Sequence, residues 1–186
     1  MSFLLIGRPN VGKSSIFNIL TKTKNIVHSE AYTTRDWHKE LIKNTSSYIF
    51  DTPGILLDEK TKTVIKDPYF DSIMNNTIET FLYVVDFKKG FNPSDQFSIN
   101  QLRKYNKEII LIINKCDNPK IPISDEFKNY GINTILNISC SHNLGFKELI
   151  IFLIKDNSNI EIKNDNDNSI AIFGKPNAGK STFLNT

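Results

Sequence analysis

The chain has 186 residues, and 39% of them are hydrophobic, so it is long enough for one full domain with a sizeable core and further chain beyond it. Its formal net charge of +3 is too small to indicate a nucleic-acid-binding surface by itself. No apolar run approaches the length of a membrane span, and residues 1–6 are too short and uncharged for a signal peptide, so we expect no membrane contact. Cys116 and Cys140 lack the spacing of metal ligands, which favours two reduced thiols in a cytoplasmic protein.

The first predicted elements are a strand, a glycine-rich loop and a helix. Residues 3–6 are an apolar run typical of a buried strand, and Ile16, Ile19 and Leu20 have the spacing of one helix face. Between them, residues 7–14 read GRPNVGKS and fit the phosphate-binding pattern G-x-x-x-x-G-K-S/T. A loop between a strand and a helix is the setting that this pattern requires.

The residue types of this loop suit the phosphates of a nucleotide and leave the base open. Gly7 and Gly12 permit the backbone to curl until successive N–H groups face one point, and the helix N-terminus adds more N–H groups. Lys13 would supply a cation to the outer phosphates, and Ser14 a hydroxyl to Mg²⁺. The predicted phosphate-binding set is Gly7, Asn10, Val11, Gly12, Lys13, Ser14 and Ser15.

The next part of the chain is expected to hold two strands and one helix. The strands cover residues 37–43 and 46–50, on either side of a tight turn, and the helix covers 70–77. Residues 25–35 are polar without a clear period, which indicates a loop. Residues 55–69 are rich in lysine and are expected to form a long mobile segment.

Two motifs in this part suit a metal ion and a γ-phosphate. Asp51 is expected to hold Mg²⁺ through water, and the Gly54 N–H to meet the γ-phosphate. Thr34 would bring its hydroxyl to the metal when its loop closes, with Thr33 as the rival residue. Such a loop, ordered by a triphosphate and released after hydrolysis, is a two-state element. The predicted catalytic set is Lys13, Thr34 and Gly54, and the predicted Mg²⁺ set is Ser14, Thr34 and Asp51.

The rest of the chain alternates strands with helices. Strands are predicted at 81–85, 108–113 and 134–138. Helices are predicted to begin at Asn92-Pro93, to cover 125–130, and to carry an apolar stripe at Phe146, Leu149, Ile150 and Leu153. This alternation implies an α/β fold in which helices cover both faces of a mostly parallel sheet.

Four motifs each follow a predicted strand directly: the phosphate loop, Asp51, Asn114 and Ser139. In a parallel sheet the ligand lies at the carboxyl ends of the strands. Chance matches scattered along a sequence would not all fall at that edge, so we interpret the four as one site.

Residues 114–117, with the sequence NKCD, are predicted to read the base. The Asp117 carboxylate can accept from the N1–H and the exocyclic amine of guanine, a donor pair that adenine lacks, so we predict GTP and GDP as ligands. Asn114 would brace the loop, and the Lys115 stem would lie over the purine. Ser139 and Cys140 form the partner loop, where the Cys140 N–H would reach the guanine carbonyl oxygen.

A second copy of the phosphate loop follows a polar stretch. Residues 174–181 read GKPNAGKS behind an apolar run at 170–173, and they repeat the first loop 167 positions later. We therefore predict a first domain at 1–155, a flexible linker at 156–169 and the start of a truncated second domain at 170–186. The corresponding binding residues are Gly174, Asn177, Gly179, Lys180 and Ser181.

The motif set GRPNVGKS, TTRD, DTPG, NKCD and SCSHNLG, in this order, resembles the bacterial GTPases of the Era, MnmE and Der (EngA) group. The tandem loop GKPNAGKS indicates Der, whose family carries two successive GTPase domains. Pro53 and Thr33 are more typical of Era, since Der proteins usually read DTGG. The resemblance implies a P-loop NTPase (Ras-like) fold of three layers, GTP hydrolysis with Mg²⁺, and a monomeric protein.

The resemblance also implies a potassium site and a partner. In this group an asparagine at the Asn10 position can help hold K⁺, which supplies the charge of a missing arginine finger; Asn177 is its counterpart. The family implies a role in assembling the large ribosomal subunit, in contact with that subunit or its RNA. That role depends on a second GTPase domain and a KH-like domain.

Position 55 leaves the rate of hydrolysis open. Ras-type GTPases place a water-orienting glutamine there, whereas Ile55 offers no hydrogen bond. Arg8 and Arg35 are candidates for an internal arginine finger, and nothing in the sequence supports either. Three hypotheses remain: a Der-like GTPase, a guanine-nucleotide-dependent binding module with negligible hydrolysis, and an Era-like GTPase with another RNA partner.

Overall fold

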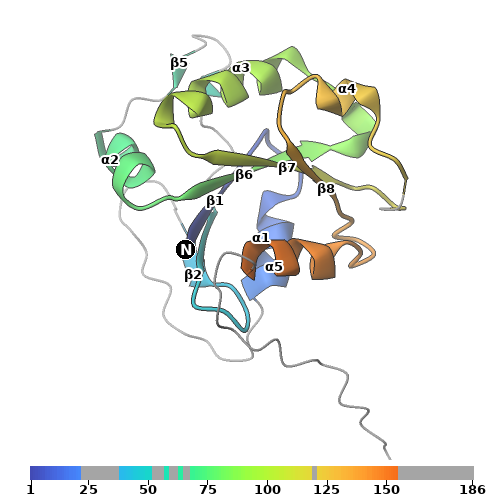
Figure 1. The fold of residues 1–186 in the computed structure, drawn as a ribbon, viewed down its shortest axis with the longest axis horizontal. Helices are drawn as coiled ribbons and strands as arrows, with labels where there is room; N and C mark the ends of the chain where they lie inside the picture. The colour runs from blue at the N-terminus through green and yellow to red at the C-terminus, as the bar shows by residue number, and fades with distance from the viewer. Residues whose placement is uncertain (22–37, 52–56, 59–62, 65–67, 119–120, 155–186) are drawn as a thin grey trace, which may run out of the picture.

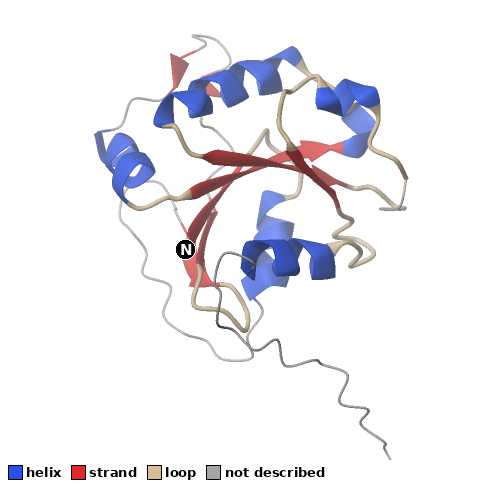
Figure 2. Cartoon of the chain, in the orientation of Figure 1, coloured by secondary structure: helices blue, strands red, loops and turns tan. Residues whose placement is uncertain are grey.

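The structure is a computed structural model that describes residues 1–21, 38–51, 57–58, 63–64, 68–118 and 121–154. Within these ranges the centre is a six-stranded sheet with the strand order β2-β3-β1-β6-β7-β8 (Figures 1 and 2). The strands are β1 (Ser2–Ile6), β2 (His38–Leu41), β3 (Tyr48–Asp51), β6 (Thr80–Asp86), β7 (Glu108–Asn114) and β8 (Thr134–Asn137). Only the pair of β2 with β3 is antiparallel in this sheet, so the prediction of a mostly parallel sheet is confirmed.

Helices cover both faces of the sheet (Figure 1). They are α1 (Lys13–Thr21), α2 (Pro68–Asn76), α3 (Pro93–Leu102), α4 (Asp125–Lys128) and α5 (Phe146–Ile154), with 3₁₀ turns η1 (Phe87–Lys89) and η2 (Arg103–Tyr105). Helices α1 and α5 lie on one face and α3 and α4 on the other. The predicted three-layer arrangement is therefore confirmed.

Each face of the sheet has its own apolar core. Ile16 of α1 and Leu149 of α5 pack in one core with Leu5 of β1. Ile99 of α3 and Phe127 of α4 pack in the other. Because both faces are covered, the central strands are nearly continuous apolar runs with buried side chains, as parallel strands of α/β proteins are.

Several predicted boundaries shift. Helix α2 begins at Pro68, two positions before the predicted start, since proline fits the first turn of a helix. A short antiparallel pair of β4 (Leu57–Asp58) and β5 (Thr63–Val64) lies inside the stretch predicted to be a long mobile segment, where the sequence indicated no strand. Two residues are too few to show the alternation by which a strand is found in a sequence.

Some predicted elements lie outside the described residues: the loop over 25–35, the linker at 156–169, and the second strand and loop at 170–186. Within the described part of the chain, none of the helices has the length and apolar character needed to cross a membrane.

Candidate functional site

The predicted site residues gather at the carboxyl ends of the parallel strands. The phosphate loop leaves β1, Asp51 is the last residue of β3, Asn114 is the last residue of β7, and Ser139 follows β8. Hydrogen bonds connect these segments to one another. The structure thus brings together four motifs that are far apart in the sequence, at the edge where such sheets bind ligands.

Two glycines of the phosphate loop allow close contacts that a side chain would block. Gly7 has a φ of 149°, and a Cβ there would lie 2.3 Å from the Val84 carbonyl oxygen. Gly12 has a φ of 101°, and a Cβ there would lie 2.2 Å from Asn114 Nδ2. The loop therefore needs glycine at both positions, for packing on β6 and for contact with the base-reading motif.

The Lys13 side chain folds back onto the phosphate loop. Its buried ammonium donates hydrogen bonds to the carbonyl oxygens of Gly7 and Arg8, both at 2.9 Å. Burial lowers the pKa of Lys13, and the negative charge of Asp51 acts against that shift. The cation is thus held inside the curl of the loop, where a phosphate group would meet it.

Ser14 and Asp51 form the predicted metal-holding pair. The Ser14 hydroxyl donates to Asp51 Oδ2 at 2.8 Å, and Asp51 is buried. Hydroxyl and carboxylate oxygens are the donors that Mg²⁺ prefers, so the residues present fit this ion. In the described ranges, no cluster of three or more His, Cys, Asp or Glu residues could hold a metal ion.

Asn114 joins three loops through one side chain that is 1% exposed. Its Nδ2 donates to the Val11 carbonyl oxygen at 2.8 Å, and its Oδ1 accepts from the Cys140 N–H at 3.2 Å. The Cys140 N–H, which we expected to be directed at guanine, is thus bonded to Asn114 in this structure. The amide braces the phosphate loop against the base-reading loops.

Lys115 connects the base-reading motif to the phosphate loop. It has a φ of 64°, and its ammonium lies 2.8 Å from both the Asn10 carbonyl oxygen and Asp86 Oδ2. Its aliphatic stem therefore crosses the gap between the two motifs. Asp86, the last residue of β6, also accepts from the Lys88 N–H at 2.9 Å.

Asp86 is a site residue that sequence analysis missed, although its place at a strand end was a signal. Burial alone would raise the pKa of Asp86, but the hydrogen bond and charge of Lys115 and the Lys88 N–H outweigh it, and the pKa is lowered. Asp86 is therefore an ionised anchor for Lys115 at neutral pH.

Asp117 lies at the open end of the site, with its side chain 54% exposed. Lys88 Nζ is 3.3 Å from one of its carboxylate oxygens, and His142 Nε2 is 3.6 Å from the other. Both partners are more than half exposed. The carboxylate is thus accessible to the base of a nucleotide, and the side chains of Lys88 and His142 lie close to it.

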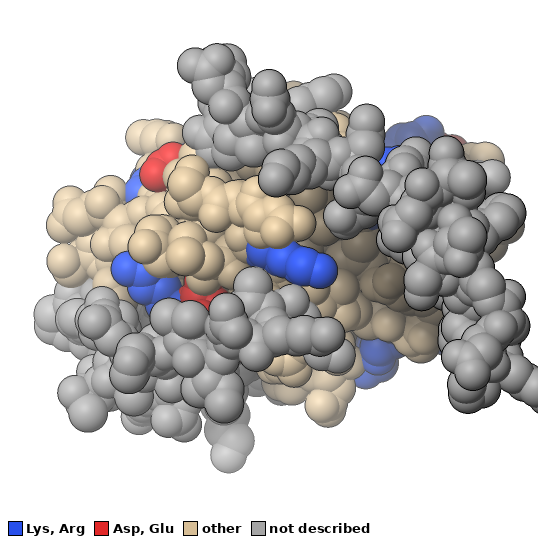
Figure 3. All heavy atoms as spheres, turned by 90° about the horizontal axis from the view of Figure 1, so that it is seen from below, with Lys and Arg blue, Asp and Glu red and all other residues tan. Residues whose placement is uncertain are grey.

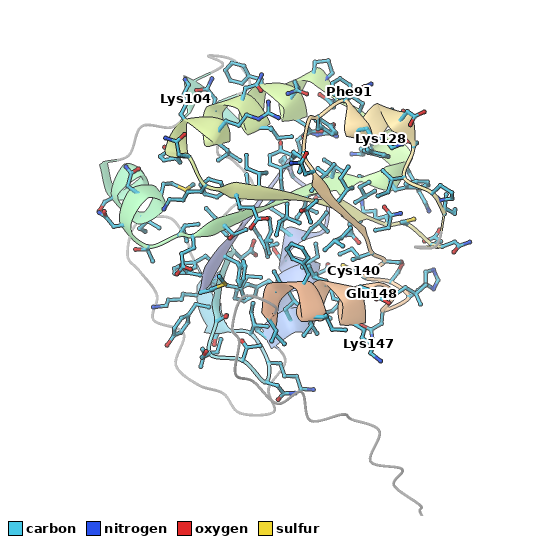
Figure 4. The ribbon with its side chains drawn as sticks, in the orientation of Figure 1. Phe91, Lys104, Lys128, Cys140, Lys147 and Glu148 are labelled. Carbon is cyan, nitrogen blue, oxygen red and sulfur yellow. The ribbon has the colours of Figure 1, made fainter. Side chains whose placement is uncertain are left out.

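Arg8 and the two cysteines are further residues that the sequence singled out. The Arg8 guanidinium is paired with Asp95, which argues against Arg8 as an internal arginine finger. Cys116 and Cys140 are free thiols, and burial raises the pKa of each, in agreement with two reduced cysteines. Cys140 lies in the loop before α5 (Figure 4).

Several predicted site residues lie outside the described ranges: Thr33, Thr34, Arg35, Gly54, Ile55, Gly174, Asn177, Gly179, Lys180 and Ser181. On the face drawn in Figure 3, the visible lysine and arginine side chains lie in separate places, and some of them have an Asp or Glu side chain beside them.

Comparison with known proteins identifies relatives. Residues 2–115 match the family model described as 50S ribosome-binding GTPase. GTPase Der of Rickettsia prowazekii (strain Madrid E) is 34% identical over an alignment of 201 residues that covers 97% of this chain and 42% of that protein. GTPase Der of Borreliella burgdorferi is 35% identical over 188 residues, covering 98% of this chain and 42% of that protein. The chain thus spans about 42% of the length of these curated relatives.

Solved structures with the same fold include the G domain of the T. maritima FeoB iron transporter, with a TM-score of 0.61, 22% identity, and coverage of 83% of this chain and 97% of that one. A GDP-bound mutant of the S. thermophilus FeoB G-domain gives a TM-score of 0.62 at 22% identity, covering 81% of this chain and 58% of that one. At this identity the likeness shows the fold alone. The predicted P-loop NTPase fold is confirmed.

Proposed function

This chain belongs to the 50S ribosome-binding GTPase family, and from that premise we propose that it binds GTP and GDP and hydrolyses GTP to GDP and phosphate. The relatives named GTPase Der support the further proposal that it is a Mg²⁺-dependent switch in assembly of the large ribosomal subunit. Its partner would be that subunit or its RNA. We propose that the protein acts as a monomer in the cytoplasm.

The contacts of Asn114 carry this proposal. One buried amide bonds to the phosphate loop at Val11 and to the base-reading side at Cys140, although Val11 is 103 positions away in the sequence. The two halves of the site therefore have a fixed separation. A nucleotide, with phosphates at one end and a planar base at the other, is a ligand that could occupy both halves of the site.

At the phosphate end, the loop N–H groups and Lys13 would bind the outer phosphates, as their curled geometry favours. Ser14 and Asp51 would hold Mg²⁺, whose positive charge would offset that of the phosphates when bound. The binding set proposed here is Gly7, Asn10, Val11, Gly12, Lys13, Ser14, Ser15 and Asp51.

At the base end, Asp117 would accept two hydrogen bonds from guanine. The Lys115 stem, fixed at its tip by Asp86, would lie along one face of the purine. Ser139 is fully buried, and its hydroxyl lies 3.1 Å from that of Ser141, which supports the loop that carries Cys140. For the Cys140 N–H to serve guanine, it would share or exchange its bond to Asn114.

Hydrolysis requires that charge on the γ-phosphate be stabilised. We assign this to Lys13, to the Gly54 N–H and to Thr34 once its loop closes. Ile55 offers no hydrogen bond and Arg8 is paired with Asp95, so we propose that a cation supplies the charge of the missing finger, with Arg35 as the alternative. Asn10 is the proposed ligand of that cation, K⁺, which would supply positive charge next to the phosphates.

The repeat of the phosphate loop supports a domain plan. We propose a first GTPase domain at 1–155, a linker at 156–169 and the beginning of a second GTPase domain at 170–186. The second nucleotide site would use Gly174, Asn177, Gly179, Lys180 and Ser181.

The test is GTP hydrolysis by this chain in potassium and in sodium at equal ionic strength. We expect tight GTP binding in both salts and faster turnover in potassium. Tight binding with a rate near that of GTP in water in both salts would instead favour the binding-module hypothesis. Failure to bind guanine nucleotide would refute the proposed function.

A matched variant separates the proposed potassium ligand from the rest of the site. Asn10→Ala should lower the rate in potassium to the sodium rate, because it removes the ligand and leaves Lys13 and Asp117 in place. A potassium effect that survives in this variant would contradict the assignment of Asn10. Co-sedimentation with large ribosomal subunits, compared with ribosomal RNA lacking proteins, tests the partner and the Era-like alternative.

A further inference from the structure

A buried carboxylate lies behind the phosphate loop, on the α3 and α4 side of the sheet. Asp95, in the first turn of α3, is 0% exposed. An ionised carboxylate in such a place must be paired and hydrogen-bonded, because removal from water is costly. Sequence analysis assigned it no role.

Four hydrogen-bond or ionic contacts satisfy Asp95. Arg8 Nε donates to Oδ1 at 2.9 Å, and Arg8 Nη2 lies 2.9 Å from Oδ2 as an ionic contact, so the guanidinium faces both carboxylate oxygens. The Tyr83 hydroxyl donates to Oδ1 at 3.0 Å, and the Tyr130 hydroxyl to Oδ2 at 3.4 Å.

Arg8 is itself part of the phosphate loop. Its carbonyl oxygen accepts from Lys13 Nζ at 2.9 Å, and its neighbour Gly7 accepts from the same ammonium. The backbone of Arg8 thus bonds the cation that would meet the phosphates, while its side chain is anchored on α3. Fixing the Arg8 side chain on α3 therefore limits the movement of the Arg8 backbone.

We propose that Asp95 is a positioning residue for the nucleotide site, acting through Arg8 to hold the first turn of the phosphate loop and the Lys13 ammonium. This inference rests on the proposed function and deepens it. It makes the start of α3 part of the phosphate-binding apparatus, although Asp95 touches no nucleotide.

The network also extends to the surface. The Tyr130 hydroxyl accepts from the Asn92 N–H at 3.0 Å, and the ring of Phe91 lies 4.7 Å from that of Tyr130 between centroids. Phe91 is exposed where α3 and α4 meet (Figure 4). Asp95 therefore bonds residues from three segments: the phosphate loop, β6 and the chain after α4.

The experiment is a double-mutant cycle on GTP affinity. A fluorescent GTP analogue is titrated with Mg²⁺ into the full chain, as wild type, Asp95→Asn, Arg8→Gln and the double variant, at a temperature where circular dichroism shows each folded. Each single change should weaken binding about tenfold, since either breaks the pair. The double change should weaken it by about the same tenfold, because the two residues act as one unit.

Ile99→Val is the matched control. Ile99 is a fully buried α3 residue in the same apolar core, so this variant disturbs the packing of the helix but not its polar contacts. Its GTP affinity should equal that of the wild type. Arg8→Lys, which keeps the charge and loses the guanidinium with its Nε donor, should recover only part of the affinity.

The results distinguish failure of the positioning role from failure of the proposed function. Wild-type affinity in Asp95→Asn, or effects that multiply to about a hundredfold in the double variant, would overturn the positioning role alone. A wild type that binds no GTP would overturn the proposed function and this inference with it. If Asp95→Asn does not fold, Arg8→Gln alone tests the role, because it removes the same pair from the other side; unchanged GTP affinity in a folded Arg8→Gln variant would overturn the role.

Discussion

The phosphate half and the base half of the site are built in different ways. Lys13 and Asp51, at the phosphate end, are buried, and each bonds to another part of the site. Asp117 and its partners Lys88 and His142 are more than half exposed. Charge-assisted bonds are stronger where water is excluded, whereas exposed pairs contribute little.

This difference indicates that the two halves do separate work. The phosphate half is preorganised, so it should supply most of the affinity for any nucleotide with outer phosphates. The base half should supply selectivity, because a base without matching donors leaves Asp117 poorly paired when bound. Mutations in the two halves should therefore differ in kind as well as in size.

The largest effect is expected for Lys13→Ala. Loss of a buried, hydrogen-bonded charge should weaken GTP binding on the order of 1,000-fold, measured by calorimetry in Mg²⁺. GDP and GTP should both suffer, because the lysine faces the phosphates. Lys147→Ala, an exposed change on α5, is the control for charge and should bind like the wild type. A loss below tenfold would contradict a preorganised phosphate half.

Asp117→Asn should change selectivity. We expect GTP affinity to fall about 100-fold and xanthosine-triphosphate affinity to rise, since an amide donor then faces the xanthine carbonyl. Competition binding with both nucleotides measures the switch. Asp125→Asn removes an equal charge from α4, where its partner is Lys128, and should leave the preference as it was. An unchanged preference in Asp117→Asn itself would refute base reading by this residue.

Asp86→Asn should reveal the ionic anchor of Lys115 through pH. The pKa of Asp86 is lowered in the fold from its ordinary 3.8, so its ionised form stabilises the protein above that pH. That contribution should be lost as pH falls through the lowered pKa. Urea unfolding at pH 7 and at low pH should therefore show the wild type more stable at neutral pH and the gap closing in acid. A gap that does not change with pH would disprove the anchor.

The smallest effect is expected for Lys88→Ala. Because Lys88 pairs with the Asp117 carboxylate that would accept from guanine, its removal should raise GTP affinity by about twofold at low salt. The gain should disappear at high salt, where exposed charges are screened. Lys104→Ala on η2 is the matched charge change, because η2 precedes β7 whereas Asp117 follows it, at the opposite end of that strand. A large loss of affinity in Lys88→Ala would mean that the base half is not the weakly paired region described above.

Motifs with fixed spacing made much of this site predictable. The phosphate loop and NKCD each follow an apolar run, so their place at one sheet edge follows from the fold class. Asn114 as a brace was predictable for the same reason. The strand order could be expected only in outline, and two-residue strands such as β4 carry too little pattern to be found.

Lys88 and Asp95 could not be assigned from sequence, and Asp86 offered only its place at the end of a strand. Each is a lone charged residue without a motif, and most charged residues are simply solvated. Asp95 looks like an ordinary acidic residue in the first turn of a helix. Its burial depends on where α3 docks on the sheet, and the reach of Arg8 depends on the curl of the phosphate loop. Both are properties of the assembled fold.

The missing side chain at Gly12 has a consequence for how the protein is made. The Asn114 amide occupies the space that a Cβ at Gly12 would need, and it bonds to Val11 from the end of β7. A nascent chain synthesised only as far as α3 thus has the full sequence of the phosphate loop without the strand that braces it. Nucleotide binding would then be a late event in folding. It could begin only after β7 has joined the sheet, when most of the domain has been made.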